Sequence, residues 1–519
     1  MYLDTNKPQV EYENFFNKEM VHFSVYDCER SIPNMVDGLK TSLRKILYSA
    51  FKRKLNSEVK VAQFSGYVSE HSAYHHGEAS LNGAIVNMAQ NYVGSNNLNL
   101  LVPNGQFGTR LKGGDDSASE RYIFTYLNPI TRALFPEADD AVLNYLDDDG
   151  QVVEPEYYVP IIPFALVNGI AGIGTGFSCN IPSYNPTELV RYLKHKLEEN
   201  QEMMDAMTFT PYYEGFKGKV EPMADAGKYL IRGVYEKIGD DKILIKELPI
   251  GTWTMNYLTF LEELCDGGGG SKTKKKNDGT VRDFVNMSTE VLIHITVHFG
   301  RGRLAELEAE QDKTLGINGV EKLLKLTTTV GTSNMNMFNS KIQLHKYKTV
   351  QEIINDYYEV RMQMYGKRKA AMVKAMEAKV REMSNRARFI QEVVDNSIDL
   401  RKMADDEATD ALLLSKQYDK QDDKYDYLTR MPMHNMNKQR VQKIMKEKET
   451  VVQELEVLRG TSLTTMWIRE LDQFVEVYRK YKEGREKIMS GSVVGGKSGG
   501  KSGVKSGGGG AKNGGGKKK

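Results

Sequence analysis

The chain has 519 residues, of which 40% are hydrophobic and 27% are charged, which is an ordinary composition for a globular protein. This length exceeds one compact core, so we expect two to four domains. There is no apolar run of about 18 residues and no signal-like start, so we expect neither a membrane span nor secretion. The net charge is only +2, so binding to nucleic acid has to be argued from local clusters.

The three cysteines are isolated from one another in the sequence. They are Cys28, Cys179 and Cys265. Their spacing fits neither a disulfide framework nor a metal site, which indicates a reducing compartment.

After a polar and aromatic lead-in, the apolar residues between Ser42 and Lys54 recur at helical spacing. Basic side chains flank this apolar stripe: Lys40, Arg44, Lys45, Lys52, Arg53 and Lys54. Such cations can contact phosphates while the apolar face packs on a core. A solvated amphipathic helix without any ligand is the simpler reading of the pattern.

The segment EHSAYHHGEAS has the composition of a metal or phosphate site. His71 and His75 are one helical turn apart, but Glu70 is misplaced for the metalloprotease pattern and no third ligand is near. We therefore predict no metal site there. His75 or His76 can instead bind a phosphate or accept a proton.

A glycine-rich loop follows, from Gly105 to Gly114, and carries Arg110 and Lys112. Glycines allow a polyanion to approach the backbone, although a plain flexible loop has the same composition. Arg121 and Tyr122 come next. A phenol is a weak nucleophile because its pKa is near ~10, and an adjacent cation can neutralise the charge that develops on a phosphate under attack. On its own, such a dipeptide is nearly always structural.

The glycine-rich segment VNGIAGIGTGFSCNI suggests a dinucleotide fingerprint, but its spacing fails at Phe177. Ile173 lies between two glycines in this segment. It is predicted either as part of a buried turn or as an apolar wedge that inserts between base pairs.

Residues 190–345 contain several strand-like runs, which predict a separate α+β unit. The low-complexity loop from Asp266 to Gly279 interrupts this unit. From about residue 349 the apolar period becomes helical, in two stripes separated by about 45 residues. This predicts an antiparallel coiled coil with a small globule at its tip. The Gly, Ser and Lys residues after Lys487 cannot build a core, so we expect a disordered tail.

Seven motifs occur in an order that is typical of one protein family. They are SIPNMVDGLK, EVKVAQFSGYV, YHHGE, QNYVGSNNLNLL, GQFGTRLKGG, SERYIFT and GIGTGFSCNIP. In these motifs the chain closely resembles the DNA breakage-reunion region of eukaryotic-type type IIA DNA topoisomerases, over roughly residues 10 to 480.

The resemblance implies roles for individual residues. The active-site tyrosine of the family falls on Tyr122, and its transition-state-stabilising arginine falls on Arg121. The YHHGE segment would lie beside the scissile phosphate, and Ile173 matches a side chain that bends DNA. The further positions implied to contact DNA are Lys40, Tyr74, Ser80, and the segment with Lys325, Thr327, Thr328 and Asn334. One departure is Glu120, where the family usually has proline.

The resemblance also implies an α+β multidomain fold. The expected parts are a lead-in (1–30), a winged-helix DNA-cleavage domain (31–190), a tower or shoulder domain (191–345), a coiled coil with an exit-gate dimerisation globule (346–485) and a disordered tail (486–519).

Two further domains of this family, an ATPase and a Mg²⁺-binding Toprim domain, have no motifs in the chain. We therefore expect Mg²⁺ ligands and ATP binding on a partner subunit, with either a split enzyme or a gene fragment as the origin. The expected partners are double-stranded DNA and a second copy of the chain, in a nucleus or at a viral or other intracellular site of DNA replication. The rival prediction is an inactive dimeric DNA-bending module. A tyrosine recombinase is disfavoured, because its set of Arg and His residues is absent.

Overall fold

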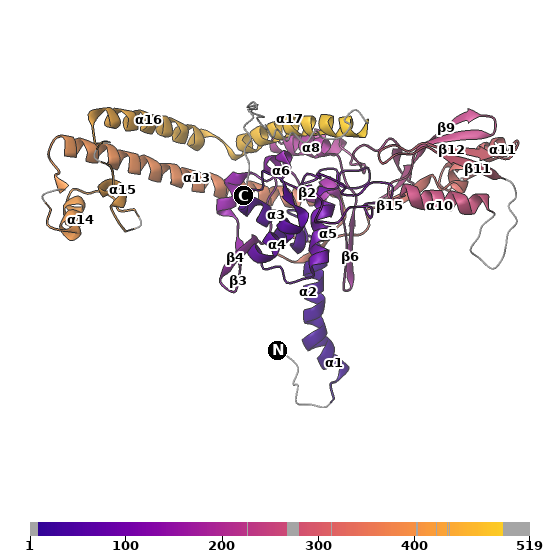
Figure 1. Cartoon of the computed structure of the whole chain (residues 1–519), viewed down its shortest axis with the longest axis horizontal. Helices are drawn as coiled ribbons and strands as arrows, with labels where there is room; N and C mark the ends of the chain where they lie inside the picture. The colour runs from indigo at the N-terminus through magenta and orange to yellow at the C-terminus, as the bar shows by residue number, and fades with distance from the viewer. Residues whose placement is uncertain are drawn as a thin grey trace, which may run out of the picture.

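The computed structural model describes residues 9–225, 227–266, 280–312, 314–400, 403–421, 423–432, 434 and 436–490. It is an α+β structure, as predicted, with a central body, a β-rich unit on one side and a long helical arm on the other (Figure 1). Most of the predicted low-complexity loop and the tail from residue 491 onward lie outside the described residues. The predicted start of the tail at residue 486 is wrong, because helix α17 runs to Met489.

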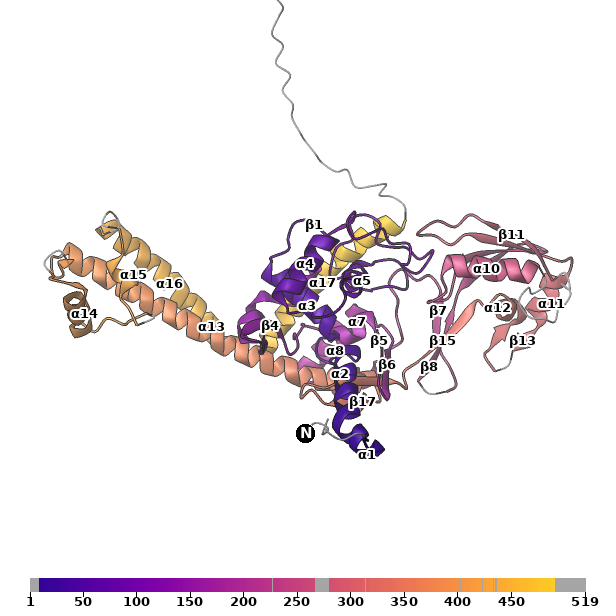
Figure 2. The same ribbon diagram turned by 60° about the horizontal axis from the view of Figure 1, so that its bottom comes forward.

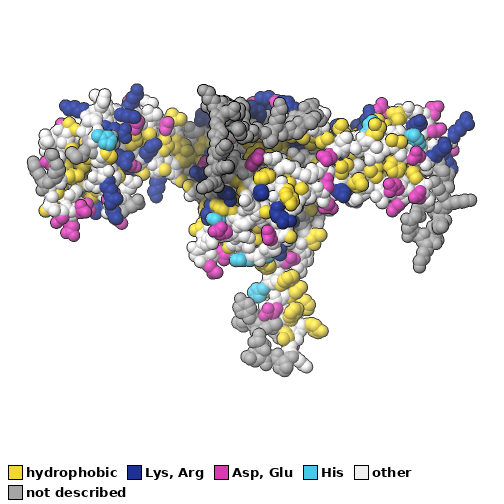
Figure 3. All heavy atoms as spheres, in the orientation of Figure 1, with side chains coloured by type: hydrophobic (Ala, Val, Ile, Leu, Met, Phe, Trp, Pro, Cys, Tyr) yellow, Lys and Arg dark blue, Asp and Glu magenta, His cyan; other side chains and the backbone are white. Residues whose placement is uncertain are grey.

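The lead-in forms a helical N-terminal arm that projects from the body (Figures 1 and 2). It consists of α1 (Tyr12–Phe15), a π-helical turn (Phe16–Met20) and α2 (Val21–Ser31). Several large apolar side chains are exposed along this arm (Figure 3), namely Val10, Tyr12, Phe15, Phe16, Val21, Phe23, Val25 and Tyr26. Solvent alone does not favour so much exposed apolar surface, so the arm has the character of a contact surface.

The central body is built mainly from helices around one large apolar core. Its helices are α3 (Thr41–Lys52), α4 (Val61–His71), α5 (Glu78–Ala89), α6 (Pro129–Leu134), the 3₁₀ turn Glu137–Val142, α7 (Phe164–Asn168), α8 (Pro186–Leu197), α9 (Gln201–Ala206) and α17 (Leu463–Met489). The short hairpin β3 (Tyr145–Asp148) and β4 (Gln151–Pro155) lies at its edge. Helix α3 confirms the helix that the apolar spacing predicts.

A four-stranded antiparallel sheet joins distant parts of the chain in this body. Its order is β17 (Leu344–Tyr347), β16 (Met335–Phe338), β6 (Phe177–Ile181) and β5 (Ile170–Gly174). Met335 pairs with Cys179, and both side chains are buried in the body core. Core membership therefore places residues 335–347, which the sequence analysis assigns to the 191–345 unit, with the body.

The β-rich unit has its own apolar core. One sheet has the order β11 (Val281–Asn286), β12 (Ile295–Phe299), β10 (Lys242–Glu247) and β9 (Val234–Gly239). A second has the order β15 (Thr327–Gly331), β8 (Lys228–Arg232) and β7 (Lys219–Pro222), and a short pair joins β13 (Gln311–Asp312) to β14 (Ile317–Asn318). Its helices are α10 (Thr254–Cys265), α11 (Arg303–Ala309) and α12 (Gly319–Leu323).

The helical arm pairs α13 (Val350–Val394) with α16 (Lys438–Gly460) side by side (Figure 2). Ile390 packs with Ile444 near the tip, whereas Lys369 donates hydrogen bonds to the carbonyls of Arg459 and Thr461 near the body. The two helices are therefore antiparallel, as the two apolar stripes predict. The short helices α14 (Asp406–Ser415) and α15 (Asp426–Thr429) form a small cluster at the tip.

The predicted apolar stripe of α13 is buried only at its two ends. Ile354 and Tyr365 are buried near the body, and Ala387 and Ile390 near the tip, whereas Met372 between them is exposed. The arm is one layer of two helices there, and two helices alone cannot enclose a central side chain.

Buried charges hold the root of α13 in the body. Arg361 donates to Asp139 over 2.6 Å, and Arg368 pairs with both Asp139 and Glu470. The hydroxyl of Tyr365 donates to Glu470 over 2.6 Å. Since Arg361, Arg368 and Asp139 are buried, each charge depends on its partners for compensation.

We predict that Asp139→Asn lowers the free energy of unfolding by about 3–5 kcal/mol, because it leaves two buried guanidinium groups without their shared carboxylate. Chemical denaturation measures the change. The matched control is Asp472→Asn, which breaks the largely exposed pair with Lys194 and is expected to cost about 1 kcal/mol or less. Equal losses in the two variants would contradict the assigned role of Asp139.

Candidate active site and nucleic-acid interface

Tyr122 lies on the surface of the body with 72% of its side chain exposed, and Arg121 beside it is also exposed. The next residue, Ile123, is buried in the core. Strand β2 (Phe124–Thr125) then pairs antiparallel with β1 (Val59–Lys60). The chain thus presents Arg121 and Tyr122 to solvent directly before an anchored strand.

Two backbone hydrogen bonds attach this loop to the first turn of α4. The N–H of Val61 donates to the carbonyl of Ile123 over 3.0 Å, and the N–H of Ala62 donates to the carbonyl of Glu120 over 3.1 Å. The first N–H groups of a helix have no partner inside the helix, so the loop supplies acceptors that α4 needs. The side chain of Glu120, which stands where proline is expected, accepts a hydrogen bond from Ser119.

The glycine-rich loop is packed against the protein itself. A Cβ at Gly108 would lie 2.5 Å from the carbonyl oxygen of Gly114, and one at Gly113 would lie 2.3 Å from the indole nitrogen of Trp253. Arg110 is buried and pairs with Glu247 over 2.5 Å. These glycines are thus explained by internal packing, without any polyanion.

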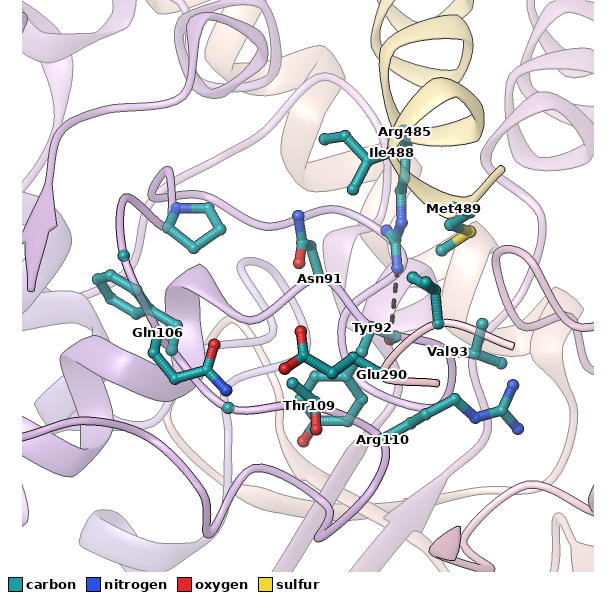
Figure 4. Close-up of a pocket in the computed structure, with 15 residues that line it drawn as sticks. Asn91, Tyr92, Val93, Gln106, Thr109, Arg110, Glu290, Arg485, Ile488 and Met489 are labelled. Atoms are coloured by element: carbon teal, nitrogen blue, oxygen red, sulfur yellow. Dashed lines mark hydrogen bonds between the residues drawn. The ribbon is translucent and has the colours of Figure 1, made fainter. Parts of the chain in front are cut away.

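Arg110 lines a cavity of about 270 Å³ between this loop and the end of α17 (Figure 4). Its burial and ion pair count against the predicted contact with DNA. Lys112 on the same loop is exposed and remains available.

The basic side chains of α3 divide in the same way. Arg44 is buried and forms a two-pronged ion pair with Asp37, whose oxygens also accept backbone N–H groups of Leu39 and Tyr158. Lys45 donates to Glu154 over 2.8 Å. Arg44 is therefore a structural residue of the SIPNMVDGLK turn, which corrects its prediction as a phosphate ligand, and Lys45 is already paired.

Lys40, at the start of α3, lies against the hairpin of β5 and β6. Partial burial lowers the pKa of its ammonium group, and nearby Cys179 acts in the opposite direction. Lys40 lies beneath Gly172, so it is close to the base of Ile173.

The YHHGE loop follows the last turn of α4. His75 is exposed and its Nε2 lies 3.4 Å from Asp148 at the tip of the β3–β4 hairpin. The Nε2 atom of His76 lies 3.1 Å from the hydroxyl of Tyr26 on α2. Tyr74 is buried and meets the ring of His76 edge to face, whereas Ser80 is exposed in the first turn of α5.

The electrostatic surroundings of His76 disfavour its cationic form. Partial burial is the largest cause of its lowered pKa, followed by the positive charges of Arg30, His75 and Lys45. His76 is therefore a neutral imidazole near pH 7.

The two candidate groups flank one helix. The Tyr122 loop is bonded to the first turn of α4, and the histidines follow its last turn. Eleven residues of α helix span about 16 Å. A nucleic-acid backbone that runs along α4 could therefore contact both ends.

Ile173 is 84% exposed, which rules out the buried-turn prediction. A Cβ at Gly172 would lie 2.2 Å from the carbonyl oxygen of Ser31, and one at Gly174 would lie 3.1 Å from the sulfur of Cys28. The two glycines let the hairpin press against α2 while Ile173, on the opposite side, faces solvent.

The remaining predicted contacts lie on two different units. Lys325 is exposed with its ammonium group over the ring of Phe260, and Thr327 and Thr328 are half-buried on β15 of the β-rich unit. Asn334 belongs to the body, where its amide donates to the hydroxyl of Ser178 over 2.7 Å, directly opposite Ile173.

The structure adds α2 residues that the sequence reasoning missed. Tyr26 contacts His76, Arg30 is near the same ring, and Asp27 accepts a hydrogen bond from Thr175 in the Ile173 hairpin. The signal was available, because Tyr26 and Arg30 are four residues apart and so share one face of a helix.

Within the described ranges, no three His, Cys, Asp or Glu side chains gather closely enough to hold a metal ion. These residues therefore do not fit a Mg²⁺ site. Among the same residues, every helix is too short or too polar to cross a membrane.

Residues 30–472 match the family model that describes the A subunit of DNA gyrase/topoisomerase IV. The chain is 40% identical to DNA topoisomerase 2 of Arabidopsis thaliana, covering 91% of this chain and 33% of that protein. It is 37% identical to DNA topoisomerase 2 of Plasmodium falciparum, covering 92% of this chain and 35% of that protein. It thus spans about a third of the length of these relatives.

A solved structure, the Plasmodium falciparum topoisomerase II DNA-binding, cleavage and re-ligation domain, superposes with a TM-score of 0.82 at 36% identity. The similarity covers 93% of this chain and 67% of that one. The fold is therefore that of the breakage-reunion region of type IIA topoisomerases. Within that class, the chain belongs to the family of the DNA gyrase and topoisomerase IV breakage-reunion subunits.

We predict that Gly172→Ala displaces the hairpin of Ile173 from α2 and lowers the thermal midpoint, because the added methyl group would overlap the carbonyl of Ser31. Differential scanning calorimetry measures the midpoint. The control is Gly66→Ala inside α4, where a Cβ meets no other atom and a gain of up to about 1 kcal/mol is expected. A Gly172→Ala protein as stable as its parent would show that the contact is not tight.

Proposed function

We propose that this chain is the DNA breakage-reunion part of a type II DNA topoisomerase, with Tyr122 as its nucleophile. The observation that carries the proposal is the pairing of an exposed phenol with an exposed guanidinium on a loop fastened to α4. Family membership and the similarity to a DNA cleavage and re-ligation domain support it.

The proposed reaction is a reversible transesterification. The hydroxyl oxygen of Tyr122 attacks a backbone phosphorus, the bond from phosphorus to the 3′-oxygen breaks, and a 5′-phosphotyrosyl link forms. The phenol loses its proton, and the departing 3′-oxygen gains one. Arg121 stabilises the negative charge on the phosphate oxygens in the transition state. The released 3′-hydroxyl then attacks the same phosphorus and expels Tyr122, so the strand is resealed without an external energy source.

The proposed DNA path lies on the side of the body from which several elements project. Helix α2 and the tips of the β3–β4 and β5–β6 hairpins all point to this side (Figure 1). Ile173 inserts between base pairs and bends the duplex there, at a cost of roughly a few kcal/mol per unstacked step. Lys40, Lys112 and Ser80 bind backbone phosphates. Lys325, Thr327 and Thr328 on the β-rich unit contact the outer part of the duplex.

The finer domain assignments belong to this proposal. The part of the body with α3, α4 and α5 is a winged-helix domain, the β-rich unit is the tower, and α13 with α16 is a coiled coil. The cluster of α14 and α15 at its tip provides a dimer contact, so that two chains cut both strands and a second duplex passes between them.

Mg²⁺ and ATP enter the proposal through a further protein unit, which carries the ATPase and Toprim domains. Bound Mg²⁺ would polarise the phosphate and support the departing oxygen. The exposed apolar arm Tyr12–Tyr26 offers such a unit a contact surface. We propose that the assembled enzyme acts in a nucleus or at another intracellular site of DNA replication, including a viral one.

The alternative from another class is an inactive dimeric DNA-bending module. The exposed wedge of Ile173 is compatible with both functions, whereas an exposed Arg121 and Tyr122 pair is needed only for cleavage. Relaxation of supercoiled plasmid, with and without candidate ATPase and Toprim subunits, separates the two.

We predict that Tyr122→Phe abolishes covalent protein–DNA complexes in the reconstituted enzyme, because it removes the nucleophilic oxygen. DNA affinity is expected to change by less than about twofold, since one exposed hydroxyl contributes little to binding. Trapping with denaturant followed by gel electrophoresis measures the covalent complex, and fluorescence anisotropy measures binding. Covalent trapping by the Tyr122→Phe protein would disprove the assignment, and a parent enzyme that never traps DNA would favour the bending module.

We predict that Ile173→Ala reduces DNA bending without preventing binding, because alanine is too small to separate stacked base pairs. Energy transfer between dyes at the two ends of a short duplex measures the bend. The control is Ile342→Ala, at another exposed isoleucine distant in sequence from the hairpin. An unchanged bend in the Ile173→Ala protein would remove Ile173 from the proposed DNA path.

A further inference from the structure

The contact between Tyr26 and His76 joins two segments that are 50 residues apart in sequence. The hydroxyl of Tyr26 lies 3.1 Å from Nε2 of His76, and the two ring centres are 6.4 Å apart. The buried ring of Tyr74 closes the other side, edge to face with the imidazole at 5.3 Å. His76 is therefore held from two sides by aromatic residues, whereas His75 points to the exposed Asp148.

The charged and titratable groups around His76 come from each neighbouring element. Tyr26 and Arg30 are on α2, Tyr74 and His75 are on the same loop, and Lys45 is on α3. Glu154 on β4 pairs with Lys45, and Asp148 on β3 pairs with His75. The nearby charges that act on His76 directly are positive, and with partial burial they lower its pKa.

A neutral imidazole has one N–H and one bare nitrogen. Because a tyrosine hydroxyl is a good donor at pH 7, it donates to the bare nitrogen in this contact, which here is Nε2. The hydrogen of the ring then resides on Nδ1. The opposite arrangement, in which Nε2–H donates to Tyr26, would leave Nδ1 as an acceptor that repels a phosphate oxygen.

We propose that Tyr26 is a positioning residue, which engages Nε2 of His76 and so leaves Nδ1–H as a donor for a DNA phosphate. The two histidines of the YHHGE loop thereby acquire different roles. His76 is a fixed neutral hydrogen-bond donor, and His75, which is more exposed, is the one free to exchange protons.

The same helix also holds the hairpin of Ile173. Asp27 accepts a hydrogen bond from the Thr175 hydroxyl over 2.8 Å, and the thiol of Cys28 donates to the carbonyl of Thr175. Tyr26, Asp27 and Cys28 are consecutive, so one turn of α2 sets the position of His76 relative to the DNA-bending side chain. This spacing gives the Tyr26 contact a reason to be rigid.

The test is a nuclear magnetic resonance titration of the full chain labelled with ¹⁵N and ¹³C in histidine, without DNA or any partner. His76→Gln identifies the signals of His76. In the parent protein we expect the Nδ1–H tautomer. In Tyr26→Phe we expect a mixture of tautomers and a pKa raised by about half a unit to one unit, because the lost donor had stabilised the neutral ring. The matched control is Tyr12→Phe, on an exposed tyrosine of the same arm, which is expected to change neither quantity.

A second readout is the affinity for a fluorescein-labelled duplex. We expect Tyr26→Phe to weaken binding about two- to tenfold, and we expect no further loss when His76→Gln is added to it. Additive losses, an Nε2–H tautomer in the parent, or an unchanged tautomer and pKa in Tyr26→Phe would each overturn the proposal. The phenyl ring keeps the packing of this half-exposed side chain, so the fold is retained.

This inference rests on the proposed function only in assigning a DNA phosphate to His76. The tautomer and the pKa are measured on the free chain, whereas the Tyr122 assay needs the reconstituted enzyme. Failure of one test is therefore distinguishable from failure of the other.

Discussion

The arrangement of the site depends on the unpaired N–H groups at the start of α4. A helix of any sequence leaves its first donors without internal partners, and here Val61 and Ala62 find theirs in the carbonyls of Ile123 and Glu120. The loop between these two carbonyls contains only Arg121 and Tyr122. A constraint of backbone hydrogen bonding, rather than of side-chain packing, thus keeps both side chains exposed and their direction defined. It also explains why Glu120 can replace proline: its contribution to the anchor is a carbonyl group, which every residue has.

The sequence predicted the α+β class, helix α3, the antiparallel arm and the exposure of Tyr122 and Ile173 through motif order and apolar spacing. It failed where a cation has two possible partners. Arg44 and Arg110 have the composition and position of phosphate ligands, yet Asp37 and Glu247 neutralise them inside the protein. Glu247 is 137 residues away from Arg110 along the chain, so no local pattern announces the pair. Likewise, the return of Met335 to the body sheet is a long-range strand pairing that apolar alternation alone does not specify.

Glycine has two different uses in this chain, and only one was visible in the sequence. Around Ile173 the missing side chains let a hairpin lie directly on α2, so that a single apolar residue stands clear of the surface. In the loop before Tyr122 the glycines fit against Trp253, Gln90 and each other. That loop is therefore a rigid support for the residues that follow it, although its composition is typical of a flexible segment.

The buried charges at the root of α13 have a mechanical consequence. A helix of 45 residues is about 68 Å long, and its first turns are clamped through Arg361 and Arg368 to Asp139. Such a clamp makes the helix a lever: a rotation of the body by about 5° would carry the far end through about 6 Å, by the same helix length. Small rearrangements of the body would thus be amplified at the tip of the arm, where neither the Tyr122 loop nor the Ile173 hairpin reaches.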